Sequence, residues 1–119
     1  MNALIVSPLL IPLATLVATL LVRRDPRAVV AISLAGALAL TAAGLVLVGL
    51  AAQGQILASQ AGGWAAPYGI TLVVDRLSAA MVAITGVVGT ATIVFAMARD
   101  EDPARCRDFH PLVHGLLVG

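Results

Sequence analysis

The chain has 119 residues, of which 61% are hydrophobic and 11% are charged, and its formal net charge is +1. Soluble domains carry about 25% charged residues, so this composition excludes an ordinary soluble domain and predicts a membrane protein. The near balance of acids and bases excludes a basic surface for nucleic acid, and the single cysteine excludes an intramolecular disulfide and a cysteine-based metal cage.

Uncharged runs between three clusters of charge predict the transmembrane helices. A bilayer core of about 30 Å requires about 20 apolar residues in a helix. We expect spans at about 3–22, 28–52 and 77–98, and the start of a truncated fourth span from about 109. The predicted fold class is therefore all-α transmembrane, with residues 1–119 forming a single membrane region.

Two local features modify the ends of these runs. Pro8 and Pro12 each remove a helix hydrogen bond, so we expect the first span to be kinked in its outer third or to begin only at Pro8. The segment 99–108 alternates acids and arginines around Pro103, and we expect a solvated turn there.

The arginines predict the orientation. Basic residues in short loops stay on the cytoplasmic side. The first and third loops hold six of the seven bases, and the loop between the second and third spans has one; the six are Arg23, Arg24, Arg27, Arg99, Arg105 and Arg107. We therefore expect a multi-pass protein of the cell membrane with its N-terminus outside.

The loop over residues 53–76 has its own structural signals. Gly62 and Gly63 precede Trp64, and residues 67–69 are Pro, Tyr and Gly, which are turn signals. The β-branched run 70–74 has strand character, so we expect a short external β-hairpin between helices two and three. Trp64 and Tyr68 fit anchors at the membrane interface better than a ligand-stacking role.

Small and hydroxylated residues recur at helical spacing in the second and third spans. Such residues let helices approach closely in lipid. We therefore predict a helix-packing role, rather than a substrate-lining role, for Ser33, Thr41, Gly44, Thr85 and Gly89. The interiors of the three complete spans contain no charged residue or histidine, so they offer no groups for handling ions.

Four residues at span entrances are candidates for structural or proton-entrance roles. Asp75 is suited to cap the third span, and with Arg76 it offers the alternative of an ion pair at the outer edge of a larger assembly. His110 and His114 are four residues apart and share one helical face. They could take up protons near neutral pH, whereas metal binding lacks an acidic partner. No catalytic, cofactor or metal motif is present, so no cofactor is expected.

Several segments resemble the D-type membrane component of the Mrp-type multisubunit sodium/proton antiporters. The matching stretches are SPLLIPL at 7–13, GGWAAPYGI at 62–70, DRLSA at 75–79 and FHPLVHGLLVG at 109–119. The second and third stretches are the most specific, and the resemblance extends over essentially the whole chain. That component is similar to the antiporter-like membrane subunits of respiratory complex I.

The resemblance implies a larger transmembrane fold with an extracellular N-terminus and a hairpin after the second span. It attributes ion movement to a glutamate and lysines beyond the third helix. No residue here can take those roles, since the chain has no lysine and its only glutamate is Glu101, in a loop. We therefore expect an N-terminal fragment of a monovalent cation (sodium)/proton antiporter subunit, a transporter component and not an enzyme.

The expected partners are the lipid bilayer and other subunits of a membrane antiporter complex. The alternative is a small three-span accessory subunit of a respiratory or antiporter complex that acts by helix packing. An unrelated membrane enzyme or sensor is disfavoured because no catalytic grouping is present.

The orientation is tested by thiol labelling. In a Cys106→Ser background, a cysteine placed in the loop 53–76 should react with a membrane-impermeant reagent added to intact cells. The unmodified chain, whose only thiol is Cys106, should react only after the membrane is permeabilised. The opposite labelling pattern would overturn the predicted topology.

Overall fold

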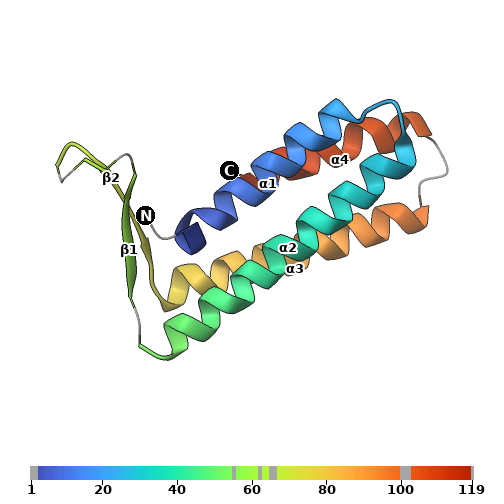
Figure 1. The fold of residues 1–119 in the computed structure, drawn as a ribbon. Coiled ribbons are helices and arrows are strands. Elements are labelled where there is room, and N and C mark those ends of the chain that lie inside the picture. The colour runs from blue at the N-terminus through green and yellow to red at the C-terminus, as the bar shows by residue number, and fades with distance from the viewer. Residues whose placement is uncertain (1–2, 55, 62, 65–66, 100–102, 119) are drawn as a thin grey trace.

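The computed structural model describes residues 3–54, 56–61, 63–64, 67–99 and 103–118. They form four helices and one β-hairpin: α1 (Ala3–Leu21), α2 (Pro26–Ala52), β1 (Leu57–Ala61), β2 (Ile70–Val74), α3 (Arg76–Arg99) and α4 (Pro103–Val118). Helix α1 lies beside α4 and α2 lies beside α3, with the hairpin at one end of the bundle (Figure 1).

Helices α1, α2 and α3 are long and apolar enough to cross a membrane. Their ends lie within two residues of the predicted spans. The predicted fold class is confirmed, including the hairpin between helices two and three. The chain is thus a multi-pass membrane protein.

Helix α1 begins at Ala3 and runs through both prolines, so the predicted late start at Pro8 is wrong. Because Pro8 has no N–H, it cannot donate to the carbonyl oxygen of Leu4, four residues earlier. The Ser7 hydroxyl donates to that oxygen instead, at 2.8 Å. The neighbouring serine thus supplies the hydrogen bond that proline removes, and the helix continues.

Helix α2 has clear signals at both ends. Asp25 is the N-cap, and its carboxylate accepts from the Arg27 backbone N–H at 3.0 Å, while Pro26 occupies the first turn, where a missing N–H costs nothing. At the other end Gly54 has a φ of 80°, the left-handed conformation that commonly follows a helix. The chain then turns into the hairpin.

Strands β1 and β2 are antiparallel, with Leu57 opposite Val74 and Ala61 opposite Ile70. The predicted strand 70–74 is confirmed, whereas β1 has no β-branched signal. The hairpin is fixed to the bundle because Val74 packs in a buried cluster with Ile5 of α1, Leu47 of α2 and Ala79 of α3. Trp64 and Tyr68, in the connection between the strands, are both exposed, so their interface role stays a prediction.

Helix α4 begins at Pro103, so the turn expected over residues 99–108 is wrong from that residue onward. Proline is favoured at the first position of a helix, and Pro103 occupies that position in α4. The charged first turns of α4 precede its apolar half. The apolar run from about 109 therefore continues a helix that has already made its first turns.

Glycines allow α2 and α3 to approach almost to backbone contact. A Cβ atom at Gly44 would lie 2.7 Å from the Cα atom of Ala83, and one at Gly86 would lie 2.7 Å from the Cα atom of Thr41. Contacts this short leave no room for a side chain. Each helix therefore presents a glycine to the backbone of the other.

A third glycine allows α1 to pack closely against the other face of α2. A Cβ atom at Gly36 would overlap the hydroxyl group of Thr15. Gly89 of α3, by contrast, faces only the movable side chain of Leu117 in α4, at 3.0 Å. Helix α2 is consequently the central helix, in contact with α1, α3 and α4.

The close approach of α2 and α3 predicts that alanine substitutions at different glycines have unequal effects on stability. Gly44→Ala and Gly86→Ala should each destabilise the bundle by about 1–3 kcal/mol, because the new methyl group overlaps backbone atoms that cannot move aside. Stability can be measured by circular dichroism during unfolding in mixed micelles of increasing dodecyl sulfate content.

Gly49→Ala is the matched control on α2, since a Cβ atom there meets nothing within 4 Å. It reports the gain in helix propensity alone, which is about 1 kcal/mol. Equal stability of the Gly44→Ala and Gly49→Ala chains would contradict the packing.

Candidate functional site

Two histidines and a serine form a buried polar cluster between α2 and α4. His110 and Ser33 are fully buried, and His114 is 1% exposed. The Ser33 hydroxyl oxygen lies 2.9 Å from Nδ1 of His110 and 3.0 Å from Nε2 of His114. One hydroxyl thus bridges two imidazoles that lie one helical turn apart.

A further contact fixes the direction of these hydrogen bonds. Nε2 of His114 lies 3.1 Å from the carbonyl oxygen of Ser33. A carbonyl oxygen can only accept, so Nε2 of His114 carries the proton and donates to it. The Ser33 hydroxyl is then free to donate to Nδ1 of His110. His110 then accepts at Nδ1, and in the neutral tautomer of His114 the lone pair lies on Nδ1.

This tautomer leaves Nδ1 of His114 as an acceptor. That atom is buried and has no hydrogen-bond partner among the residues that the structure describes. A buried polar atom without a partner costs about 1–3 kcal/mol. Such a cost inside an otherwise satisfied cluster marks the atom as a point of functional interest.

The sequence predicts part of this cluster. The spacing of His110 and His114 correctly places both on one helical face, and the spacing in α2 predicts a helix-packing role for Ser33. The bridge between them joins residues 77 and 81 positions apart, which no local pattern reveals. No group of three potential metal ligands occurs among the described residues, so the cluster is a hydrogen-bonded site with two imidazoles.

An ion pair lies at the charged end of this helix pair. Arg23, after α1, donates to the carboxylate of Asp108 in the second turn of α4. Both side chains are about half exposed, and such pairs contribute about 0–1 kcal/mol. The pair joins the first loop to α4 at the charged end of the bundle.

Asp75 and Arg76 do not pair with each other. The Asp75 carboxylate accepts from the Ser78 backbone N–H at 2.7 Å, and the Asp75 backbone N–H donates to the Ser78 hydroxyl at 2.8 Å. This reciprocal pair is a capping box at the start of α3. Arg76 instead donates to the carbonyl oxygen of Ala51, at 3.2 Å, at the end of α2.

Three more of the predicted packing residues fall into two groups. Thr41 and Gly44 lie in the α2–α3 interface, where the Thr41 hydroxyl is 3.1 Å from that of Thr90. Thr85 is exposed and donates to the Met81 carbonyl oxygen of its own helix. A packing role for Thr85 therefore stays a prediction that needs a neighbour outside the described chain.

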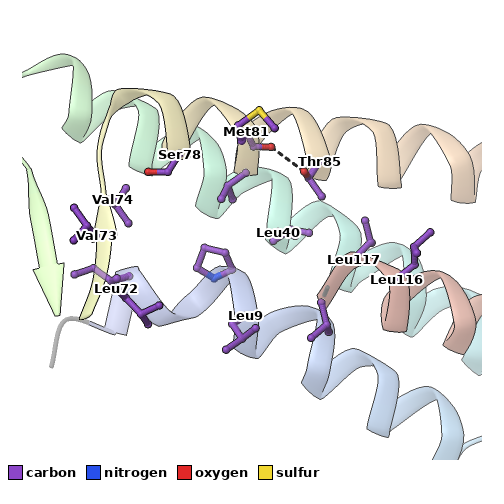
Figure 2. A pocket seen from close by; sticks show the side chains of 14 residues that line it. Leu9, Leu40, Leu72, Val73, Val74, Ser78, Met81, Thr85, Leu116 and Leu117 are labelled. Carbon is purple, nitrogen blue, oxygen red and sulfur yellow. Dashed lines mark hydrogen bonds between the residues drawn. The ribbon is translucent and has the colours of Figure 1, made fainter. Parts of the chain in front are cut away.

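Thr85 lies on the wall of an apolar groove. The groove has a volume of about 530 Å³ and is lined by α1, α2, α3, β2 and the end of α4, with Leu9, Leu72 and Leu116 among its walls (Figure 2). None of its lining residues is charged or a histidine. It offers a mainly apolar surface, on which Ser78 and Thr85 carry the polar side chains.

Comparison with known proteins bears on the family. No family model matches the chain. The chain is 36% identical, over a 127-residue alignment covering all of it, to a protein of Rhizobium meliloti that is named as the probable D component of a K(+)/H(+) antiporter. The resemblance to this type of antiporter component is confirmed. The chain spans 23% of the length of that relative.

The capping box predicts how the stability of the chain responds to acid. Hydrogen bonds from the Ser78 backbone N–H and hydroxyl hold the pKa of the Asp75 carboxyl below its ordinary value of 3.8. Because the pKa of Asp75 is lower in the folded state than in the unfolded state, the ionised carboxylate stabilises the folded chain at pH values above the unfolded-state pKa. This contribution is lost as the pH falls through the folded-state pKa. Asp75→Ala should therefore lower the unfolding midpoint at pH 7, and the difference from the unmodified chain should narrow below about pH 4.

The measurement is thermal unfolding in detergent between about pH 3 and pH 7. Ser78→Ala is the matched variant, because it keeps the backbone N–H and loses only the hydroxyl. Its effect at pH 7 should be smaller than that of Asp75→Ala. A difference between Asp75→Ala and the unmodified chain that does not vary with pH would contradict the role of the ionised carboxylate.

Proposed function

We propose that the chain is a membrane component of a monovalent cation/proton antiporter. The observation that carries the proposal is the 36% identity, over the whole chain, to a probable antiporter component of Rhizobium meliloti. Three helices of membrane length and a pair of buried histidines support it. The role is that of a transporter component and not of an enzyme.

The cation of this antiporter is sodium or potassium. The resemblance in the sequence is to sodium/proton antiporters, whereas the printed name of the Rhizobium meliloti relative refers to K⁺. The interiors of α1, α2 and α3 contain no charged side chain that would select between the two. We therefore propose the class of monovalent cation and let the transport assay separate sodium from potassium.

The partners of the chain are other subunits of a membrane complex, within the cell membrane, with the N-terminus outside. Large apolar side chains on the outer faces of α1 and α3 support the membrane surroundings and the helix partners, including Leu10, Leu20, Ile84 and Phe95, which are 45–62% exposed. Lipid or apolar helices are the surroundings in which such faces are stable.

The proposal is tested by transport in everted membrane vesicles from the native host. Respiration acidifies the vesicle interior, and sodium or potassium is then added while a fluorescent amine reports the pH gradient. Deletion of the gene should reduce the cation-dependent loss of the gradient for one of the two cations, and restoring the gene should recover it.

Gly44→Ala and Gly49→Ala provide the matched restoring variants. The first places a methyl group against the α3 backbone and should restore less transport than the second, which meets open space. Identical cation-dependent signals with and without the gene would contradict the antiporter role. They would favour the accessory role in helix packing, for which the close α2–α3 contact is the supporting observation.

A further inference from the structure

We propose that Ser33, His110 and His114 form a proton-binding site between α2 and α4. In this site Nδ1 of His114 receives the proton, and the Ser33 hydroxyl couples the two imidazoles. The use of this site in antiport rests on the function proposed above, whereas its ability to bind a proton does not.

The receiving atom follows from the hydrogen bonds. Nε2 of His114 already carries a proton, because it donates to the carbonyl oxygen of Ser33 at 3.1 Å. Nδ1 is then the basic nitrogen of that ring, and it is buried without a partner among the described residues. The lone pair of Nδ1 is thus the position in the cluster where a proton can add without breaking an existing hydrogen bond.

Binding and transfer balance within the three side chains. A proton from water forms an N–H bond at Nδ1 of His114, and the ring gains one positive charge. The Nε2 proton can then pass to the Ser33 oxygen as the Ser33 hydroxyl proton passes to Nδ1 of His110, over distances of 3.0 Å and 2.9 Å. The charge moves from His114 to His110, and Ser33 is a hydroxyl again.

In α1, α2 and α3 no titratable side chain lies in the middle of the helix. Helix α1 has no titratable residue, and those of α2 and α3 are at their ends: Arg27, Arg76 and Arg99. In α4, among side chains that the structure describes, Arg105 and Asp108 are exposed toward the charged end.

Apolar burial opposes charge on an imidazole, whereas a donor bond to the Ser33 carbonyl strengthens when the ring is charged. The charge of a protonated His114 is therefore stabilised by the hydrogen bond that Nε2, and not Nδ1, donates to the Ser33 carbonyl oxygen.

The site can be tested by nitrogen NMR because the chain has only two histidines. The full chain, with ¹⁵N-labelled histidine, is placed in phospholipid nanodiscs and titrated from about pH 5 to pH 8, the range in which imidazoles ordinarily change charge. Nδ1 of His114 should move from the shift of an unprotonated nitrogen to that of a protonated one, and the His110 signals should respond at the same pH. Neutral shifts for His114 throughout this range would overturn the site.

Ser33→Ala tests the coupling. Loss of the hydroxyl should abolish the response of His110 to protonation of His114, while the donor bond to the backbone carbonyl of residue 33 remains. Thr19→Val is the matched control: it removes an equally buried hydroxyl that donates only to carbonyl oxygens of its own helix. Coupled titration that persists in Ser33→Ala would overturn the bridging role.

His114→Gln separates proton binding from positioning in transport. The glutamine amide can still donate to the Ser33 carbonyl, but it cannot bind a proton near neutral pH. In the vesicle assay this variant should slow cation-driven proton movement at least about tenfold and flatten its pH profile between about pH 5 and 8.

Unchanged rates in His114→Gln, beside a clear effect of deleting the gene, would overturn the use of the site in antiport. If deletion itself has no effect, the proposed function fails, and the NMR titration still decides whether the proton site exists.

Discussion

The near-contact of the α2 and α3 backbones at Gly44 and Gly86 is the constraint on which the rest of the fold depends. In lipid there is no hydrophobic drive to bring apolar helices together, so close backbone packing has to hold them. Helix α2 uses a different small residue for each neighbour. Gly44 lies against the backbone of α3, and Gly36 lies against Thr15 of α1. Ser33 makes hydrogen bonds with the two histidines of α4. The buried polar site therefore follows from the same crowding that fixes the bundle.

Hydroxyl groups in this bundle divide by the partner to which they donate. Thr15, Thr19 and Thr85 donate to carbonyl oxygens of their own helices, and Ser7 does so at the carbonyl that Pro8 leaves free. Such bonds satisfy polar groups locally, as a membrane requires, and they add no contact between helices. Thr41 and Ser33 differ because their hydroxyls also reach another helix: that of Thr41 lies 3.1 Å from the Thr90 hydroxyl of α3, and that of Ser33 bridges two imidazoles of α4. The titratable imidazoles separate the Ser33 site from a packing contact such as Thr41–Thr90, although both are built on small hydroxylated residues.

Properties that depend on local sequence could be predicted, and those that depend on tertiary pairing could not. The apolar runs locate α1, α2 and α3, and the β-branched run locates β2. Strand β1 has no strand propensity of its own and exists because it pairs with β2. The start of α4 could not be predicted because a charged segment that contains Pro103 is typical of a loop, whereas here it forms the first turns of a helix. Ser33 is recognisable as a helix-facing residue, but its partners lie 77 and 81 positions away.

The position of α4 along the bundle is held by two unequal contacts. The Arg23–Asp108 pair is half exposed, and water weakens it. The Ser33 bridge is buried, and its hydrogen bonds have no competing water, so breaking it leaves imidazole nitrogens without partners in an apolar interior. The buried bridge therefore contributes more than the ion pair to the register of α4 against α2. Any shift of α4 would have to break the hydrogen bonds that define the tautomer of His114.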